Sequence, residues 1–328
     1  MRRFLLKRGI RYIATLWLVL TVAFILFRLV PGDPTVTMLS GSFDPETLDR
    51  MRENFGLDRP VHEQYILYLG NFLMGDFGTS FTHHSPVRGI LVHRFLNSLV
   101  LIVPAILTIS VGAFLVGSFS GWRKGNDGEK AISFSIVTLR AIPHFVLGII
   151  LLMIFSAQLG WLPTGGMGPI TRPDPSFTGT VMDPGFLKYL ALPLATLILH
   201  YMSEPYLLMR GMIMGDKNAE YVRFHRLKGF DEDEVQRFAA RNNMLPLVTY
   251  IPVMIVVMVG GLILIEVVFS WPGIGQELVS AVHRRDYPVA QGAFFVIAFA
   301  IVTGNLLADL AYSYLDPRVR LGGEPDGQ

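Results

Sequence analysis

Six long apolar segments constrain this chain more than any other feature. Each runs for roughly 20 residues or more, which is the length that a helix rising about 1.5 Å per residue needs to cross a hydrocarbon core about 30 Å thick. They lie near residues 11–30, 98–119, 131–159, 187–209, 248–269 and 291–314. Charged residues make up only 16% of the chain, against about 25% in an average soluble domain. The sequence therefore predicts an all-α integral membrane protein with six transmembrane helices.

The distribution of Lys and Arg predicts how these helices are oriented. Loops on one side of the membrane carry about twice as many basic residues as those on the other, although the second set is longer. Because basic residues are retained on the cytoplasmic side, we expect both termini in the cytoplasm. The basic N-terminus resembles the start of a signal peptide, but its apolar segment is too long and Pro31-Gly32-Asp33-Pro34 replaces a cleavage site.

These segments divide the chain into four parts. Residues 1–30 form a cytoplasmic N-terminus and the first transmembrane helix, and residues 31–97 form an external cap segment with expected helices at 44–55 and 60–73. Residues 98–314 form a five-helix transmembrane core, and residues 315–328 form a cytoplasmic tail. Within the core, the Gly- and Pro-rich residues 160–186 predict an irregular outer loop.

The longest cytoplasmic loop, residues 210–247, contains the clearest local pattern. Residues 218–228 predict a helix whose apolar stripe comprises Tyr221, Val222, Phe224 and Leu227. Gly229 is expected to end this helix, and Asp231 is expected to cap the next one, with Glu234 completing a capping box. From the residues alone this hairpin is either a solvated link between two spans or a surface that another protein grips.

A few polar side chains interrupt the apolar segments. They are Arg140, His144, His200, Glu204, Glu266, Asn305 and Asp309. Polar groups are costly in hydrocarbon, so these should face the helix bundle, water or each other. Two interpretations remain open, which are pairing that holds helices together and a role in lining a path for cargo.

Several kinds of chemistry are excluded or disfavoured. The chain has no Cys, which removes disulfides, thiolate metal sites and cysteine nucleophiles, and its net charge of +2 gives no indication of nucleic acid binding. It lacks the Gly-x-x-x-x-Gly-Lys-Ser/Thr phosphate loop, so we expect no ATP hydrolysis by this chain. The pair His83-His84 is better explained as solvated loop than as a metal site. An intramembrane hydrolase is disfavoured, whereas an ion-driven transporter with Glu204 and Asp309 as proton sites stays open.

Short segments along nearly the whole chain resemble one family, the permease subunits of bacterial ABC importers of the dipeptide/oligopeptide/nickel group. The similar segments are residues 27–34, 55–60, 75–80, 142–145, 159–163, 220–230, 241–246, 266–269, 272–275 and 316–318. Each is weak alone, but their order and spacing agree with the family. The chain departs from the common pattern at Phe224, His225 and His144, where many relatives carry small residues.

The resemblance implies a type I importer-like permease in the bacterial inner membrane, surrounded by lipid. Its implied partners are a second homologous permease subunit, two ATPase subunits that bind ATP and Mg, and an external binding protein that delivers dipeptides or oligopeptides. The same architecture could import nickel chelates or oligosaccharides. The resemblance also implies that loop 210–247 is the coupling loop, which contacts the ATPases. We expect its coupling surface to comprise Glu220, Tyr221, Arg223, Lys228, Gly229, Phe230 and Asp231. No cofactor is expected in this chain.

Overall fold

The computed structural model describes residues 2–29, 59–169 and 176–315, and within these ranges the chain forms helices and no strands. Two compact units are present. The first comprises residues 1–98 and 272–303, and the second comprises residues 99–271 and 304–328. The all-α prediction is confirmed.

The first unit contains helices from both ends of the chain. They are α1 (Arg2–Leu29), α4 (Val61–Leu73), α14 (Ile274–Arg284) and the first part of α15 (Tyr287–Leu315). Helix α5 (Val87–Trp122) begins in this unit and continues into the second. Helix α4 is the expected helix at 60–73, whereas the expected helix at 44–55 lies outside the described residues. Helix α14 was not predicted from the sequence.

The second unit contains the remaining helices. They are α6 (Asp127–Ala141), α7 (His144–Leu151), the π-helix η1 (Leu152–Gln158), α8 (Phe177–Val181), α9 (Phe186–Tyr201), α10 (Ser203–Asp216), α11 (Glu220–Leu227), α12 (Glu232–Asn242) and α13 (Met244–Val268). Gly160 and Gly166 adopt left-handed backbone angles in the predicted irregular loop, but the short α8 was not expected there.

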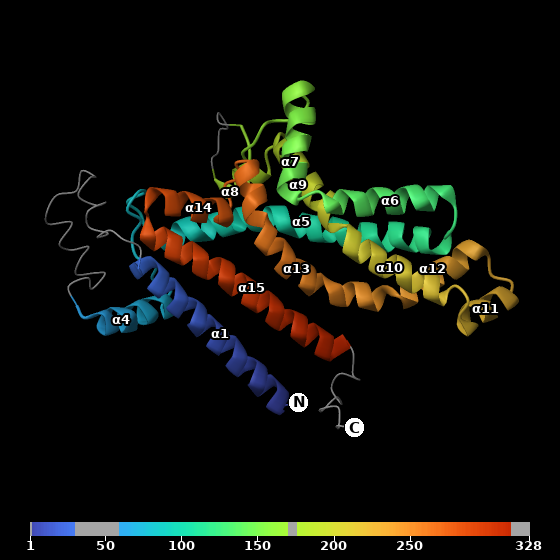
Figure 1. The fold of residues 1–328 in the computed structure, drawn as a ribbon, viewed down its shortest axis with the longest axis horizontal. Helices are drawn as coiled ribbons and strands as arrows, with labels where there is room; N and C mark the ends of the chain where they lie inside the picture. Colours follow the sequence, from blue (N-terminus) through green and yellow to red (C-terminus); the bar gives the residue numbers. More distant parts are fainter. Residues whose placement is uncertain (1, 30–58, 170–175, 316–328) are drawn as a thin grey trace. The chain divides into compact units, whose positions relative to one another are not determined.

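The predicted spans correspond to helices of two kinds. Helices α1, α5, α13 and α15 are each long and apolar enough to cross a membrane. The third and fourth predicted spans are not continuous helices but bent pairs, α6 with α7 and η1 at 105°, and α9 with α10 at 44° (Figure 1). The chain thus has four candidate spans among the described residues, or six if each bent pair is one span.

Prolines explain both bends. Pro143 disfavours a helical conformation at the residue before it, and Ile142 is indeed extended, with φ −81° and ψ 124°. Pro205 cannot donate the backbone hydrogen bond that would normally reach the carbonyl of Tyr201, so the helix is weakened where α9 meets α10. A proline permits a kink, but it does not by itself set the sharpness of the first bend.

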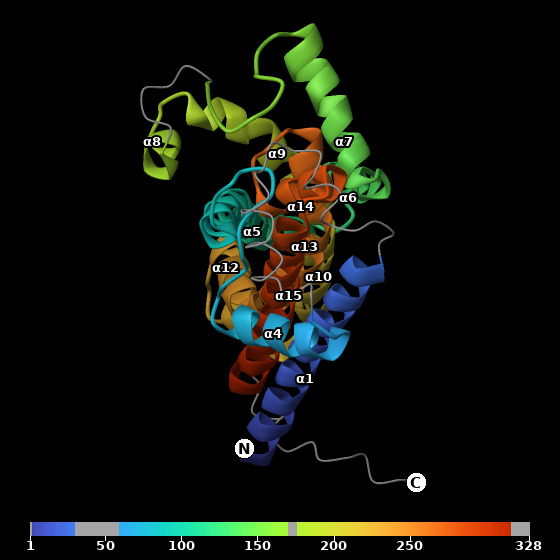
Figure 2. The same cartoon turned by 90° about the vertical axis from the view of Figure 1, so that its left-hand side faces the viewer.

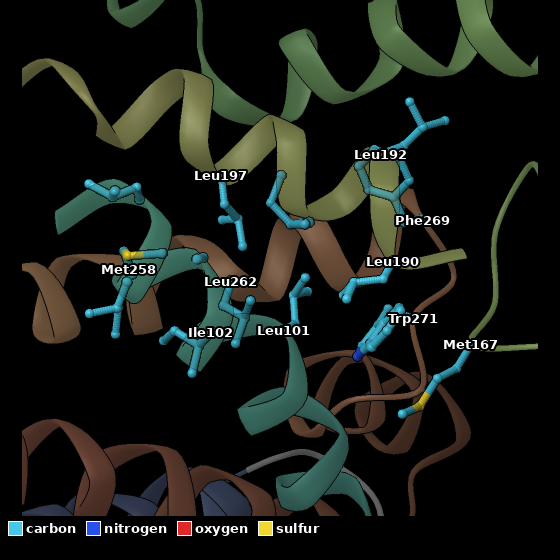
Figure 3. Packing of buried hydrophobic residues seen from close by; sticks show 14 of the residues in the cluster. Leu101, Ile102, Met167, Leu190, Leu192, Leu197, Met258, Leu262, Phe269 and Trp271 are labelled. Atoms are coloured by element: carbon cyan, nitrogen blue, oxygen red, sulfur yellow. The ribbon is translucent and has the colours of Figure 1, made fainter. Parts of the chain in front are cut away.

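The core of the second unit is built from α5, α9, α13 and the loop after α13. Figure 3 shows Leu101 and Ile102 of α5 near Met258 and Leu262 of α13, with Leu190 close to Trp271. Phe269 and Trp271 are fully buried, and the Phe269 carbonyl accepts a 2.8 Å hydrogen bond from the Gly166 amide. Helix α7 packs against both α9 and α13.

In the first unit, α4 crosses α1 (Figure 2) and the Thr21 and Tyr65 hydroxyls are hydrogen bonded at 2.6 Å. The buried Asp286 carboxylate accepts hydrogen bonds from the Ser80 hydroxyl at 2.5 Å and from the backbone amide of Thr82 at 3.0 Å. Arg94 of α5 forms a 2.8 Å ion pair with Glu277 of α14. These contacts fix loop 79–86 against the turn between α14 and α15.

Helices α5 and α10 approach closely at glycines. A methyl group added at Gly121 would lie 2.7 Å from the Arg210 carbonyl oxygen and 2.9 Å from the Ile213 Cβ. One added at Gly117 would lie 2.8 Å from the Met209 Cβ. These neighbours are backbone or Cβ atoms, which cannot move without shifting a helix, so the small residues set the distance between the helices.

We therefore expect Gly121→Ala to lower the melting temperature of the detergent-purified protein, because overpacking costs about 1–3 kcal/mol. Gly211→Ala is the matched control, since a methyl group at Gly211 would meet no atom within 4 Å. An equal effect of the two substitutions would contradict the close approach of α5 and α10.

Candidate functional site

Helices α11 and α12 form a hairpin that follows α10, as Figure 1 shows. Gly229 lies in the turn with φ +84°, a left-handed conformation that glycine adopts without steric cost. The predicted helix and its end at Gly229 are thus confirmed. Asp231 occupies the N-cap position of α12, but within the described hairpin its side chain makes no capping hydrogen bond, so the capping box prediction was wrong.

The inner side of the hairpin packs onto the ends of transmembrane helices. Val222 of α11 and Val235 and Ala239 of α12 are buried in one cluster with residues of α5 and α10. The members contributed by those two helices are Trp122, Met209 and Ile213. The hairpin is therefore anchored by apolar contacts and is not a solvated link.

Asp216, the last residue of α10, holds both arms of the hairpin. Its carboxylate accepts hydrogen bonds from the Tyr221 hydroxyl and from the Asn243 side-chain amide, the latter at 2.6 Å. Burial, together with the hydrogen bond to Asp216, raises the pKa of Tyr221 to about 12, so its hydroxyl remains a donor at neutral pH. Tyr221 thus points inward, unlike the other residues predicted for the coupling surface.

A second brace joins the turn ends of α11 and α12. The Arg226 guanidinium donates to both carboxylate oxygens of Glu232, at 2.6 and 3.3 Å. These hydrogen bonds hold the pKa of Glu232 below its usual range. Arg226 also lies over the Trp122 ring at 5.4 Å, and Lys217 donates to the Trp122 carbonyl at 2.6 Å. The hairpin is consequently tied to the end of α5.

The outer side of the hairpin is exposed and partly apolar. Of the residues predicted for coupling, Glu220, Arg223, Lys228, Gly229, Phe230 and Asp231 are exposed. Phe224 and Leu227 are exposed by 55% and 79%, beside Phe230 at 48%. Lys228 lies over the Phe224 ring at 4.4 Å. We call Phe224, Leu227 and Phe230 the outer apolar patch.

The predicted single stripe on α11 was wrong, because its members lie on two faces. At about 100° per residue, Phe224 and Leu227 are about 60° apart, whereas both lie more than about 130° from Val222. Val222 is fully buried against the bundle, and the other two point away from it. The apolar residues that face outward are thus a feature that the sequence analysis missed.

A polar cluster lies between the two bent helix pairs in the second unit. Arg140 near the end of α6 forms an ion pair with Glu204 at the start of α10. Glu204 also accepts a hydrogen bond from the Tyr250 hydroxyl of α13. Both charged side chains are nearly half exposed, at 46% and 44%. A central charge in a membrane costs roughly 2.5–3.5 kcal/mol by insertion scales, so their pairing is expected.

Two histidines of the cluster bond to backbone carbonyls, one at the break before α7 and one within α13. His200 Nδ1 lies 3.1 Å from the Ile142 carbonyl oxygen, and His144 Nε2 lies 3.1 Å from the Gly261 carbonyl oxygen. Since carbonyls only accept, each ring nitrogen must carry a proton as the donor. The two rings are 5.3 Å apart.

A pocket of about 90 Å³ opens at this cluster. Its lining comprises Arg140, His200, Tyr201, Glu204, Tyr250, Met254 and Val257. The structure therefore brings together Arg140, His144, His200 and Glu204, and adds Tyr201 and Tyr250, which the sequence analysis missed because tyrosine is common in membrane helices. The described residues contain no group of three or more His, Asp or Glu that could hold a metal ion.

The remaining predicted path residues do not belong to the pocket. Glu266 is fully buried near the C-terminal end of α13. Its backbone carbonyl oxygen accepts a 2.8 Å hydrogen bond from the Trp271 amide in the turn that follows. Asn305 is exposed on α15. The side chain of Asp309 lies outside the described part of the chain.

Comparison with known proteins identifies the chain. Residues 113–321 match the family described as binding-protein-dependent transport system inner membrane component, and residues 1–102 match the N-terminal region of such membrane components. The oligopeptide transport system permease protein AppB of Bacillus subtilis (strain 168) is 31% identical over 97% of this chain and 99% of its own length.

The glutathione transport system permease protein GsiC of Salmonella typhimurium is also 31% identical, over 98% of this chain and 99% of its own length. The match to both relatives is full length, and the family match covers most of the chain. Together with the apolar helices, these matches identify a multi-pass protein of the inner membrane. The chain belongs to the family of inner membrane components of binding-protein-dependent transport systems.

Proposed function

We propose that this chain is one half of the translocation path of an ATP-driven importer of dipeptides or oligopeptides. The observation that carries the proposal is the anchored α11–α12 hairpin with its exposed outer apolar patch. A rigid hairpin that is braced at both ends can transmit a push to the helices on which it rests, whereas a flexible loop would absorb the movement.

The proposed partners at this hairpin are two separate ATPase subunits, which bind ATP and Mg. The chain itself has no phosphate loop, so the energy must come from other subunits. Exposed Phe224, Leu227 and Phe230 offer apolar anchors, and Glu220, Arg223 and Asp231 surround them with charge. An apolar centre with a polar rim is the usual anatomy of a protein interface.

The same assembly would include one partner outside the membrane and one within it. An external binding protein would deliver the cargo, and a second homologous permease subunit would complete the path. Both termini and the hairpin would lie in the cytoplasm, because the loops on that side hold the excess of Lys and Arg. The relatives named as oligopeptide and glutathione permeases support peptide-like cargo over nickel chelates or oligosaccharides.

The cargo path is proposed to run past the polar cluster of Arg140, His144, His200 and Glu204. Half-exposed charges in a transmembrane unit are stable when they face water or another subunit. Glu266, Asn305 and Asp309 remain further candidates for the path. No cofactor within this chain is needed for such a role.

Gly229→Val should uncouple ATP hydrolysis from uptake. A β-branched residue is strained by about 1–2 kcal/mol in the left-handed conformation, so the turn would rearrange, although a methyl group there would meet no atom within 4 Å. The measurement is the ratio of ATP hydrolysed to peptide imported by the complete complex in proteoliposomes. Gly229→Asn is the control, because Asn tolerates this conformation. An unchanged ratio in the Val variant would count against a coupling role of the α11–α12 hairpin.

Leu227→Asp should weaken binding of the ATPase subunits. Loss of one buried Leu costs about 1.5–3 kcal/mol, which corresponds to roughly tenfold to a hundredfold in affinity. Retention of the ATPases on the tagged chain during purification measures the effect. Met182→Asp is the matched control, since Met182 is 82% exposed but lies in the predicted outer loop. Equal retention of the ATPase subunits in both variants would show that they bind elsewhere on the chain.

Glu232→Gln tests the ion pair between Arg226 and Glu232 through its pH dependence. The lowered pKa of Glu232 means that its contribution to stability is complete above the ordinary value of 4.5 and is lost as the pH falls through the folded-state pKa. We expect the wild type to melt slightly above the variant at pH 7 and the difference to shrink as the pH falls below 4.5. A difference that is independent of pH would show that the carboxylate charge is irrelevant.

A further inference from the structure

The pocket beside Arg140 lies deep within the transmembrane unit. Arg140 is about 20 Å along α6 from Asp127, and Glu204 is about 18 Å along α10 from Asp216, at 1.5 Å per residue. A hydrocarbon core is about 30 Å thick. The ion pair is therefore well inside the membrane and distant from the hairpin, at the level where both helix pairs bend.

The ion pair leaves most of the hydrogen-bond donors of Arg140 unused. Within the described residues, one guanidinium nitrogen of Arg140 contacts Glu204, and no other hydrogen bond of Arg140 is formed. A guanidinium has five N–H donors in a planar fork, so most of those on Arg140, which lines the pocket, stay unused within the described residues. Glu204, by contrast, is held by both Arg140 and Tyr250.

The pocket is polar on one side and apolar on the other. Arg140, His200, Tyr201, Glu204 and Tyr250 form the polar part, and Met254 and Val257 form the apolar part. Its volume of about 90 Å³ is several times the roughly 10–15 Å³ that a cavity needs to hold one water molecule. Such a space accepts a small charged end group and not a whole peptide.

We propose that this pocket is a subsite for a carboxylate of the cargo, which binds the guanidinium of Arg140. The proposal rests on the proposed peptide import. Arg matches a carboxylate through two parallel hydrogen bonds, and no other cation lines the pocket among the described residues. Arg140 and Tyr250 both keep their contacts with Glu204 while the unused donors of Arg140 bind the cargo carboxylate.

Glu204 acts in this arrangement as an internal competitor. The cargo shares Arg140 with Glu204, whose negative charge repels a second carboxylate, so the net gain is small and the cargo is held only weakly. Weak binding suits a transport path, because cargo that enters the site must also leave it. Removal of the competing charge should therefore strengthen the preference for carboxylates, which a purely structural ion pair would not do.

The test compares three peptide probes in proteoliposomes that contain the complete transporter. The probes are Ala-Ala-Ala, its C-terminal amide, and the C-terminal amide of Ala-Glu-Ala. Uptake rates are divided by the occupancy of the external binding protein, so that its own preference is removed. The variants are Glu204→Gln and the double variant Arg140→Gln with Glu204→Gln, which leaves no unpaired charge in the pocket.

We expect the wild type to import the free acid several-fold faster than its amide. In Glu204→Gln the acid-to-amide uptake ratio should rise to roughly tenfold or more, because the Glu204 carboxylate no longer competes with the cargo for the Arg140 guanidinium. In the double variant it should fall to about one. The third probe shows whether a side-chain carboxylate can replace the terminal one, and either pattern supports a carboxylate subsite.

Equal acid-to-amide ratios in wild type and both variants, with uptake retained, would overturn the subsite and leave peptide import standing. If the wild-type complex imports none of the peptides, the proposed cargo is wrong and the subsite is overturned with it. Folding of each variant is checked by its basal ATP hydrolysis in the assembled complex.

Discussion

Backbone polar groups have no water to bind in hydrocarbon, and this constraint explains where the helices of this protein break. A break frees carbonyl groups that must find donors nearby. At Ile142 the donor is His200, and His144 reaches the Gly261 carbonyl on α13. The polar side chains that interrupt α6, α7, α9 and α10 thus belong to the bends themselves.

The same bends place charge beside a space. Arg140 and Glu204 sit at the ends of α6 and α10 that meet near the breaks, and Tyr250 of α13 completes the cluster. From Glu204, α10 continues to Asp216, which binds Tyr221 and Asn243 of the hairpin region. One helix thus has the polar pocket at its first turn and the hairpin brace at its last. In the proposed importer, α10 would be a direct mechanical link between the motor and the path.

Much of the architecture could be predicted from the sequence, because hydrophobic length and glycine chemistry are local properties. The apolar segments, the helix before Gly229 and the left-handed turn at Gly229 followed from residues close in the chain. The family resemblance was confirmed by the full-length matches. The bends at Pro143 and Pro205 were not predicted, since a bend angle depends on what each helix half packs against.

Long-range contacts account for what the sequence did not indicate. Asp216 and Asn243 are 27 residues apart, and Arg140 and Glu204 are 64 apart, so no local pattern pairs them. The expected stripe on α11 failed because Val222 was grouped with Phe224 and Leu227, although helical geometry separates them. The capping box failed because the Asp231 side chain, although at the N-cap position, makes no hydrogen bond to the described first turn of α12. Local patterns predicted the helices, whereas tertiary packing decided which faces are exposed.

The most direct test of the central claim is site-specific cross-linking from the outer apolar patch. The natural chain has no Cys, so Leu227→Cys introduces a single thiol that can carry a photoreactive label. In membranes that contain the complete transporter, the account predicts a covalent product with an ATPase subunit, whose yield changes with nucleotide. Cross-links to an external protein, or labelling of this thiol by an impermeant reagent from outside the cell, would contradict it.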